Sequence, residues 1–85
     1  MSVKIFYFAW VREKIGLDHE EFQLPSPQIT IADLISSLKS RGAPYQDALE
    51  HETVIRAAIN QEHADHDQMI KDGDEIALFP PMTGG

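Results

Sequence analysis

The sequence contains no cysteine, few basic residues and no long apolar run. Without cysteine the chain cannot form disulfides, thiolate metal sites or a cysteine nucleophile, and this fits a reducing compartment. No apolar segment approaches the roughly 20 residues that a membrane-spanning helix needs, and residues 1–4 show no signal-peptide pattern. These absences predict a soluble cytoplasmic protein without a membrane partner.

Basic residues are outnumbered two to one. The 85 residues include 7 Lys and Arg against 14 Asp and Glu, which gives a net charge of −7. Nucleic acid is therefore not expected as a partner, because no basic stripe is available to displace counterions from phosphates. The acidic surface suits either a basic protein partner or simple solubility.

The first apolar segment, residues 3–10, alternates in residue type and predicts a strand. Both of its faces are apolar, which favours a central strand that is covered by the core on one side and by core or a partner on the other. The aromatic residues Phe6, Phe8, Trp10 and Phe79 are predicted to be core. The alternative is that one or two of them form, with Met82, an exposed patch for a partner.

The remaining pattern predicts one clear helix and three further strands. The helix covers residues 30–41, with Thr30 as N-cap, Asp33 completing a capping box and Gly42 at the C′ position. Residues 11–16 are a short connector, either irregular or one helical turn, ended by Gly16. The other elements are strands at 20–24, 54–59 and 75–79, turns at 60–62 and 71–74, and a short bridge at 67–70. Residues 43–52 are expected to be irregular, with a helical turn near 46–49.

This order of elements predicts an α+β fold with one main helix on one face of a mixed sheet. The first and last strands would be parallel neighbours in the middle of the sheet, joined by a right-handed crossover through the helix. That arrangement is the β-grasp. Residues 1–79 are expected to form this domain, and residues 80–85 an extended tail.

The tail ends in Gly84-Gly85, so its last two residues lack side chains and can enter a narrow slot. Pro80 and Pro81 favour an extended, semi-rigid entry to it. The chemical group that such an end offers is an unhindered carboxyl. No nucleophile–base pair, phosphate loop or carboxylate pair stands out elsewhere, so the chain is not expected to be a complete enzyme.

Three segments resemble the small subunit of molybdopterin synthase. They are Phe6-Tyr7-Phe8-Ala9 followed by Arg12-Glu13 and Gly16, then Ala58-Ile59-Asn60-Gln61, and finally residues 71–77 with Phe79-Pro80-Pro81-Met82-Thr83-Gly84-Gly85. The last segment is the most specific.

The resemblance implies a sulfur carrier with a ubiquitin-like β-grasp fold. Its tail, Phe79 to Thr83, would enter a partner. Gly85 would carry the sulfur, and Gly84 beside it would fit a narrow channel because it has no side chain. An ATP-dependent adenylyltransferase similar to ubiquitin-activating enzymes would activate Gly85, and a sulfur donor enzyme would convert it to a thiocarboxylate. The large subunit of the synthase, in a two-plus-two heterotetramer, would use that sulfur to build the dithiolene of molybdopterin from a cyclic pyranopterin monophosphate. No permanently bound cofactor is implied; the activating enzyme uses the ATP.

Other interpretations remain open. The chain could be a sulfur carrier for thiazole or tRNA thiolation, a ubiquitin-like protein modifier, or an interaction domain with an incidental Gly-Gly end. His63 and His66 with Asp65 and Asp67 are spaced too loosely for a metal site, which needs three or four converging ligands, so no metal is expected.

Overall fold

A computed structural model of the chain describes residues 1–81, and residues 82–85 lie outside the described part. The elements are β1 (Ser2–Tyr7), α1 (Ala9–Ile15), β2 (His19–Gln23), β3 (Gln28–Thr30), α2 (Ile31–Lys39), α3 (Ala43–Ala48), a 3-10 turn (Glu52–Val54), β4 (Arg56–Ile59), β5 (Glu62–Ala64), β6 (Met69–Lys71) and β7 (Glu75–Phe79). Among the described helices, none is long and apolar enough to cross a membrane.

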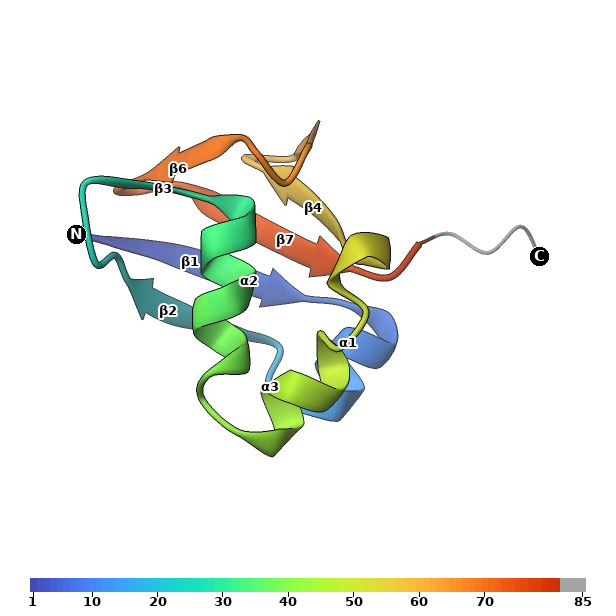
Figure 1. The fold of residues 1–85 in the computed structure, drawn as a ribbon. Coiled ribbons are helices and arrows are strands. Elements are labelled where there is room, and N and C mark those ends of the chain that lie inside the picture. The colour runs from blue at the N-terminus through green and yellow to red at the C-terminus, as the bar shows by residue number, and fades with distance from the viewer. Residues whose placement is uncertain (82–85) are drawn as a thin grey trace.

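A mixed sheet of five strands, in the order β2-β1-β7-β4-β5, forms the body of the fold. β1 and β7 are parallel neighbours, whereas β1–β2, β4–β7 and β4–β5 are antiparallel. Helix α2 crosses one face of this sheet, and α1 and α3 lie together at one end of it (Figure 1). The predicted β-grasp architecture, including the central pairing of the first and last strands, is confirmed.

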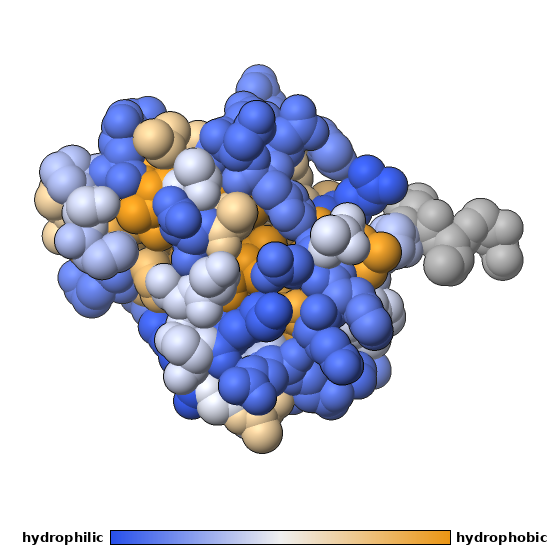
Figure 2. Space-filling view, viewed as in Figure 1, coloured by the Kyte–Doolittle hydropathy of each residue, from blue (hydrophilic) through white to orange (hydrophobic). Residues whose placement is uncertain are grey.

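The core lies between α2 and the sheet face that carries the odd-numbered residues of β1. Ile5 and Tyr7 of β1 and Ile76 and Leu78 of β7 are buried there against Leu34 and its neighbours on α2. Figure 2, seen from the same side, shows hydrophilic residues over much of the surface around this core. Burial of this single face therefore supplies most of the hydrophobic stabilisation.

Local chemistry fixes the ends of the helices. Thr30 Oγ1 accepts a hydrogen bond from the Asp33 backbone N–H at 3.0 Å, and Asp33 Oδ2 accepts one from the Thr30 N–H at 3.1 Å. This is the predicted capping box. Gly16 ends α1 in the left-handed region at φ 88°, also as predicted. Gly42, predicted as the C′ residue of the long helix, instead begins α3 at φ 136°.

The first strand is shorter than predicted. It ends at Tyr7, and Trp10 belongs to α1. Ala9 adopts φ 53°, a left-handed conformation that L-residues rarely take, and this turns the chain out of the strand. The alternating aromatic residues could not reveal this turn, because Phe8-Ala9-Trp10 carries no glycine or proline.

Two pairings were missed or only partly predicted. β3 pairs with β6 as a separate two-stranded sheet, of which the pattern gave only the bridge near Ile70. β5 begins at Glu62, where a turn was predicted, and Val54 lies in the 3-10 turn before β4 rather than in the strand. Asn60 and Gln61 form the tight turn itself, both with positive φ.

Candidate functional site: the tail root and the outer face of the sheet

The tail leaves the body from the middle of the sheet. Phe79 is the last residue of β7, which is held by β1 on one side and by β4 on the other. Phe79, Pro80 and Pro81 are half-buried. The predicted site residues Met82, Thr83, Gly84 and Gly85 lie outside the described residues. The root of the tail is therefore fixed by the two most central strand pairings of the fold.

The sheet face opposite α2, called here the outer face, carries one continuous row across all five strands. Register places His19, Phe6, Ala77, Ala58 and His63 side by side, one from each strand. The three central members are half-buried and the two histidines are exposed. The middle of the row is thus apolar, while its two ends are ionisable.

Beside this row the outer face is hollowed. A depression of about 240 Å³ is lined by Phe6, Phe8, Ala77 and neighbouring atoms of Gln61, Glu75 and Ile76. Phe8 is 47% exposed, and its backbone N–H donates to the Leu78 carbonyl at 3.2 Å, next to the root of the tail. We call Phe6, Phe8, Ala58, Ala77 and Phe79 the apolar band.

The prediction that Phe6, Phe8, Trp10 and Phe79 belong to the core is wrong. Phe8 and Trp10 are exposed, and Phe6 and Phe79 are half-buried on the outer face. The alternative, an exposed apolar patch, describes these side chains. A grouped exposure of large apolar side chains is typical of a surface that binds a partner. Met82, the other predicted member of the patch, lies outside the described residues.

A polar cluster on the opposite side of β1 holds the end of this strand in place. The Glu20 carboxylate accepts hydrogen bonds from Tyr7 Oη and Tyr45 Oη, both at 2.7 Å, and from Arg41 Nη1 at 2.6 Å. Burial acts to raise the pKa of Glu20, but these three donors outweigh it and leave the pKa below its ordinary value. Burial, with the hydrogen bond to Glu20, raises the pKa of Tyr7 well above the usual range.

His63 and His66 lie in different surroundings. No group of three or more potential ligands converges among residues 1–81. His66 Nε2 is 2.7 Å from the Ile55 carbonyl oxygen, which makes it the donor, and His63 stands on the outer face. These two residues therefore have structural and surface positions that the sequence spacing alone could not distinguish.

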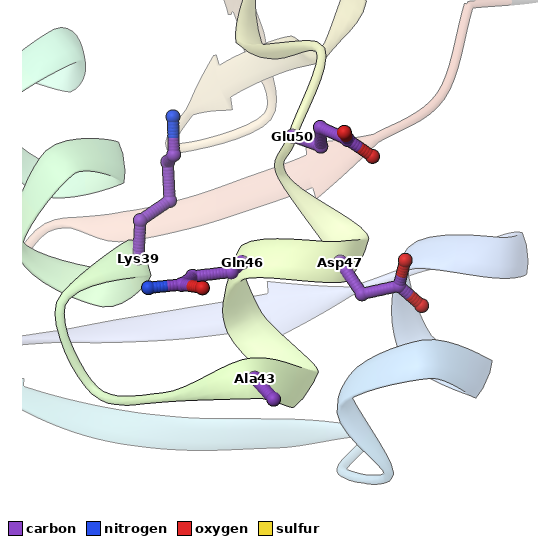
Figure 3. Close-up of a pocket in the computed structure, with 5 residues that line it drawn as sticks. All are labelled: Lys39, Ala43, Gln46, Asp47 and Glu50. Carbon is purple, nitrogen blue, oxygen red and sulfur yellow. The ribbon is translucent and has the colours of Figure 1, made fainter.

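A hollow larger than the depression beside the apolar band lies elsewhere and has no convergent side chains. It measures about 440 Å³ and is lined by Lys39, Ala43, Gln46, Asp47 and Glu50. Figure 3 shows that the Lys39, Asp47 and Glu50 side chains do not converge on one point. Asp47 is occupied by an ion pair with Lys14 at 3.1 Å. This hollow is an open surface depression rather than a reaction site.

The fold and the position of the tail define a ubiquitin-like β-grasp protein. The sequence matches the ThiS family over residues 5–85, and the chain belongs to this family.

Two curated relatives are named molybdopterin synthase sulfur carrier subunit. The protein from Escherichia coli is 37% identical and the alignment covers 98% of this chain and 99% of the relative. The protein from Dictyostelium discoideum is 42% identical, with 96% and 94% covered.

Two solved structures are similar in fold and sequence. SAMP1 from Haloferax volcanii has a TM-score of 0.77 at 26% identity, with both chains fully covered. A chain from the protein–protein complex of subunits 1 and 2 of the molybdopterin-converting factor of Helicobacter pylori has a TM-score of 0.66 at 25% identity, also with full coverage. The likeness therefore extends to a structure in which such a chain is bound to another subunit.

Sequence reasoning missed several residues of the outer face. Ala58 and Ala77 belong to the apolar band only because β4 and β7 align them with Phe6, and Arg56 stands beside Phe79 for the same reason. A strand-by-strand register would have found them, since residues paired across a sheet share one face. Residue type alone gave no signal at these positions.

Proposed function

We propose that this chain is the sulfur carrier subunit of a molybdopterin synthase. The observation that carries the proposal is the extent of the similarity: the ThiS family match includes the Gly84-Gly85 end, and relatives of this name align over nearly their full length. Residues 1–79 would form the body and residues 80–85 the tail that enters partner sites.

The chemistry begins at the Gly85 carboxylate, which is a poor electrophile. An activating enzyme similar to ubiquitin-activating enzymes joins it to AMP from ATP and releases pyrophosphate. Hydrosulfide supplied by a donor enzyme then attacks the acyl carbon and displaces AMP, which leaves a thiocarboxylate on Gly85 with no change of oxidation state. The ATP is used by the activating enzyme, and the carrier itself keeps no permanent cofactor. These steps place the carrier in the cytoplasm, with ATP and both enzymes.

In the second stage, the carrier delivers the sulfur on Gly85 to the large subunit. The ionised sulfur on Gly85 attacks a carbon of the cyclic pyranopterin monophosphate in the large subunit and displaces an oxygen substituent from it, which joins the two molecules as a thioester. Water then cleaves the bond between the Gly85 carbonyl carbon and sulfur, so that the sulfur stays on the pterin and the Gly85 carboxylate is restored. A segment of six residues, the length of 80–85, reaches on the order of 20 Å when it is extended, which is far enough for its end to enter a buried pocket. Holding the sulfur beside its acceptor replaces a bimolecular encounter, which accounts for much of the rate gain.

The apolar band gives the large subunit a surface to dock on. It surrounds the root of the tail, so a partner bound there receives the tail along the direction of β7. The H. pylori structure of subunits 1 and 2 supports a complex of this kind. The two prolines, Pro80 and Pro81, reduce the entropy that the tail loses when it docks.

The mass of the intact chain, purified from its native host, tests the proposal. An increase equal to replacing one oxygen by one sulfur, located at Gly85, is expected. Deletion of Gly85 should abolish sulfuration of the pterin while the thermal unfolding of the domain stays unchanged. An unmodified mass after incubation with ATP, a sulfur donor and the host's activating enzyme would contradict the proposal, as would an active deletion variant.

Further assays separate the alternatives. The likeness to SAMP1, a small archaeal modifier protein, favours protein modification as the second candidate. That function predicts covalent adducts on lysines of other proteins that survive denaturation. A thiocarboxylate that is consumed in thiazole or tRNA thiolation assays, but not by the large subunit with its pterin, would identify a carrier of another pathway.

A further inference from the structure

Most basic side chains of this acidic protein are paired with carboxylates. Within residues 1–81, five of the seven form ion pairs within 4.0 Å: Arg12–Asp18, Lys14–Asp47, Lys39–Glu52, Arg41–Glu20 and Lys71–Asp74. Lys4 and Arg56 form none at this distance within the same residues. The cross-strand neighbours of Lys4 are two carboxylates, Glu21 and Glu75, whereas that of Arg56 is the apolar Phe79.

Arg56 lies at the edge of the apolar band. It is exposed, it begins β4, and it lies opposite Phe79, the residue from which the tail departs. The apolar band is therefore bounded at the root of the tail by a guanidinium. Because paired residues share a face, the Arg56 side chain rises from the outer face beside the Phe79 ring.

A small cleft lies next to this guanidinium. It measures about 240 Å³ and is lined by Arg56, His63 and His66 together with Asp65, Thr53, Ile55 and Ala64. His66 is held by its hydrogen bond to the Ile55 carbonyl, so this wall of the cleft is fixed. The lining includes one carboxylate, Asp65, and one permanent cation, Arg56. The Arg56 guanidinium has the donors that bind a carboxylate side chain.

We propose that Arg56 and this cleft receive an acidic side chain of the large subunit, an inference that rests on the proposed function. An apolar band alone allows a partner to dock in several orientations, because apolar contact is not directional. One charged pair at the edge of the band selects one of them. Since the carrier has a net charge of −7, a carboxylate on the partner is repelled over most of this surface and attracted at Arg56. The ion pair between Arg56 and this carboxylate thereby orients the carrier so that its tail faces the pocket of the large subunit.

Three variants test this with the purified large subunit from the same organism. Arg56→Gln removes the charge, Arg56→Lys keeps it without the planar fork, and Lys4→Gln removes one charge from the far end of the same face. Calorimetric titration at low and high salt gives the dissociation constants. We expect Arg56→Gln to weaken binding about tenfold at low salt and clearly less at high salt. Arg56→Lys and Lys4→Gln should each change it by less than about threefold.

The outcomes are distinct for the two proposals. A loss for Arg56→Gln that is no larger than for Lys4→Gln, or that salt does not reduce, overturns the inference about Arg56 and leaves the docking of the large subunit intact. Failure of the unaltered chain to bind the large subunit at all overturns both. Thermal unfolding of each variant should match that of the unaltered chain, since both side chains are exposed.

Discussion

The two faces of the central sheet have similar side chains and different surroundings. On the inner face, Ile5 and Leu78 are completely buried beneath α2, whereas on the outer face Phe6 and Phe79 are only half-buried. From residue composition alone, both faces of the sheet would be predicted to belong to the core. The difference shows that the outer face has apolar area that the described chain does not cover, and a binding partner can cover it.

The largest effect should follow from truncating the inner face. Ile5→Ala removes a fully buried side chain and should cost about 2–5 kcal/mol of unfolding free energy, through lost burial and the cavity left behind. Phe6→Ala, one residue away on the outer face, should cost about 1 kcal/mol or less although it removes a larger side chain. Denaturant unfolding of both variants measures this. Equal losses would mean that the two faces do not differ in the free chain.

The next effect concerns binding rather than stability. Phe8→Ala should weaken the affinity for the large subunit by about 2 kcal/mol or more, as expected for an aromatic anchor, and leave unfolding nearly unchanged because Phe8 is exposed. Met69→Ala is the matched control, since Met69 is also exposed but lies on β6 in the other sheet. An equal loss of affinity in both variants would place the interface elsewhere.

The polar cluster should give a smaller, pH-dependent effect. Glu20→Gln loses the charge that holds Arg41 and should cost about 1.5 kcal/mol of stability at neutral pH. Since folding lowers the pKa of Glu20 below 4.5, the stabilisation is full above that value and is lost as the pH falls through the lower folded pKa. Urea unfolding across acid pH measures it. A variant whose deficit stays constant down to strongly acid pH would contradict this assignment.

The smallest effect should come from the turn between β1 and α1. Ala9 adopts φ 53°, so Ala9→Gly removes an unfavourable backbone conformation and should stabilise the chain by up to about 1 kcal/mol. A rise in the melting temperature is the expected result. Ala32→Gly, in the exposed first turn of α2, is the matched control and should lower it. A fall in both variants would show that Ala9 is not strained.

The local parts of the fold were readable from the sequence. Thr30 and Asp33 indicated the start of α2, and Gly16 indicated the end of the connector that contains α1. The parallel pairing of β1 with β7 is non-local, and the order of the elements predicted it. The other non-local parts were not predicted. Whether Phe6 and Phe8 are covered depends on what lies over the outer face, and the place of Arg56 and Ala58 depends on the β4–β7 register. For the site, the sequence supplied the tail but not the surface around its root.

The position of β7 also has a mechanical consequence. Its last residue leads directly into the tail, and four residue pairs join it to β1 and four to β4. A pull on the tail acts along the strand and loads both ladders in shear, so their hydrogen bonds share the load instead of opening one after another. The end of the chain can therefore be drawn repeatedly out of deep pockets without the body unravelling from that end.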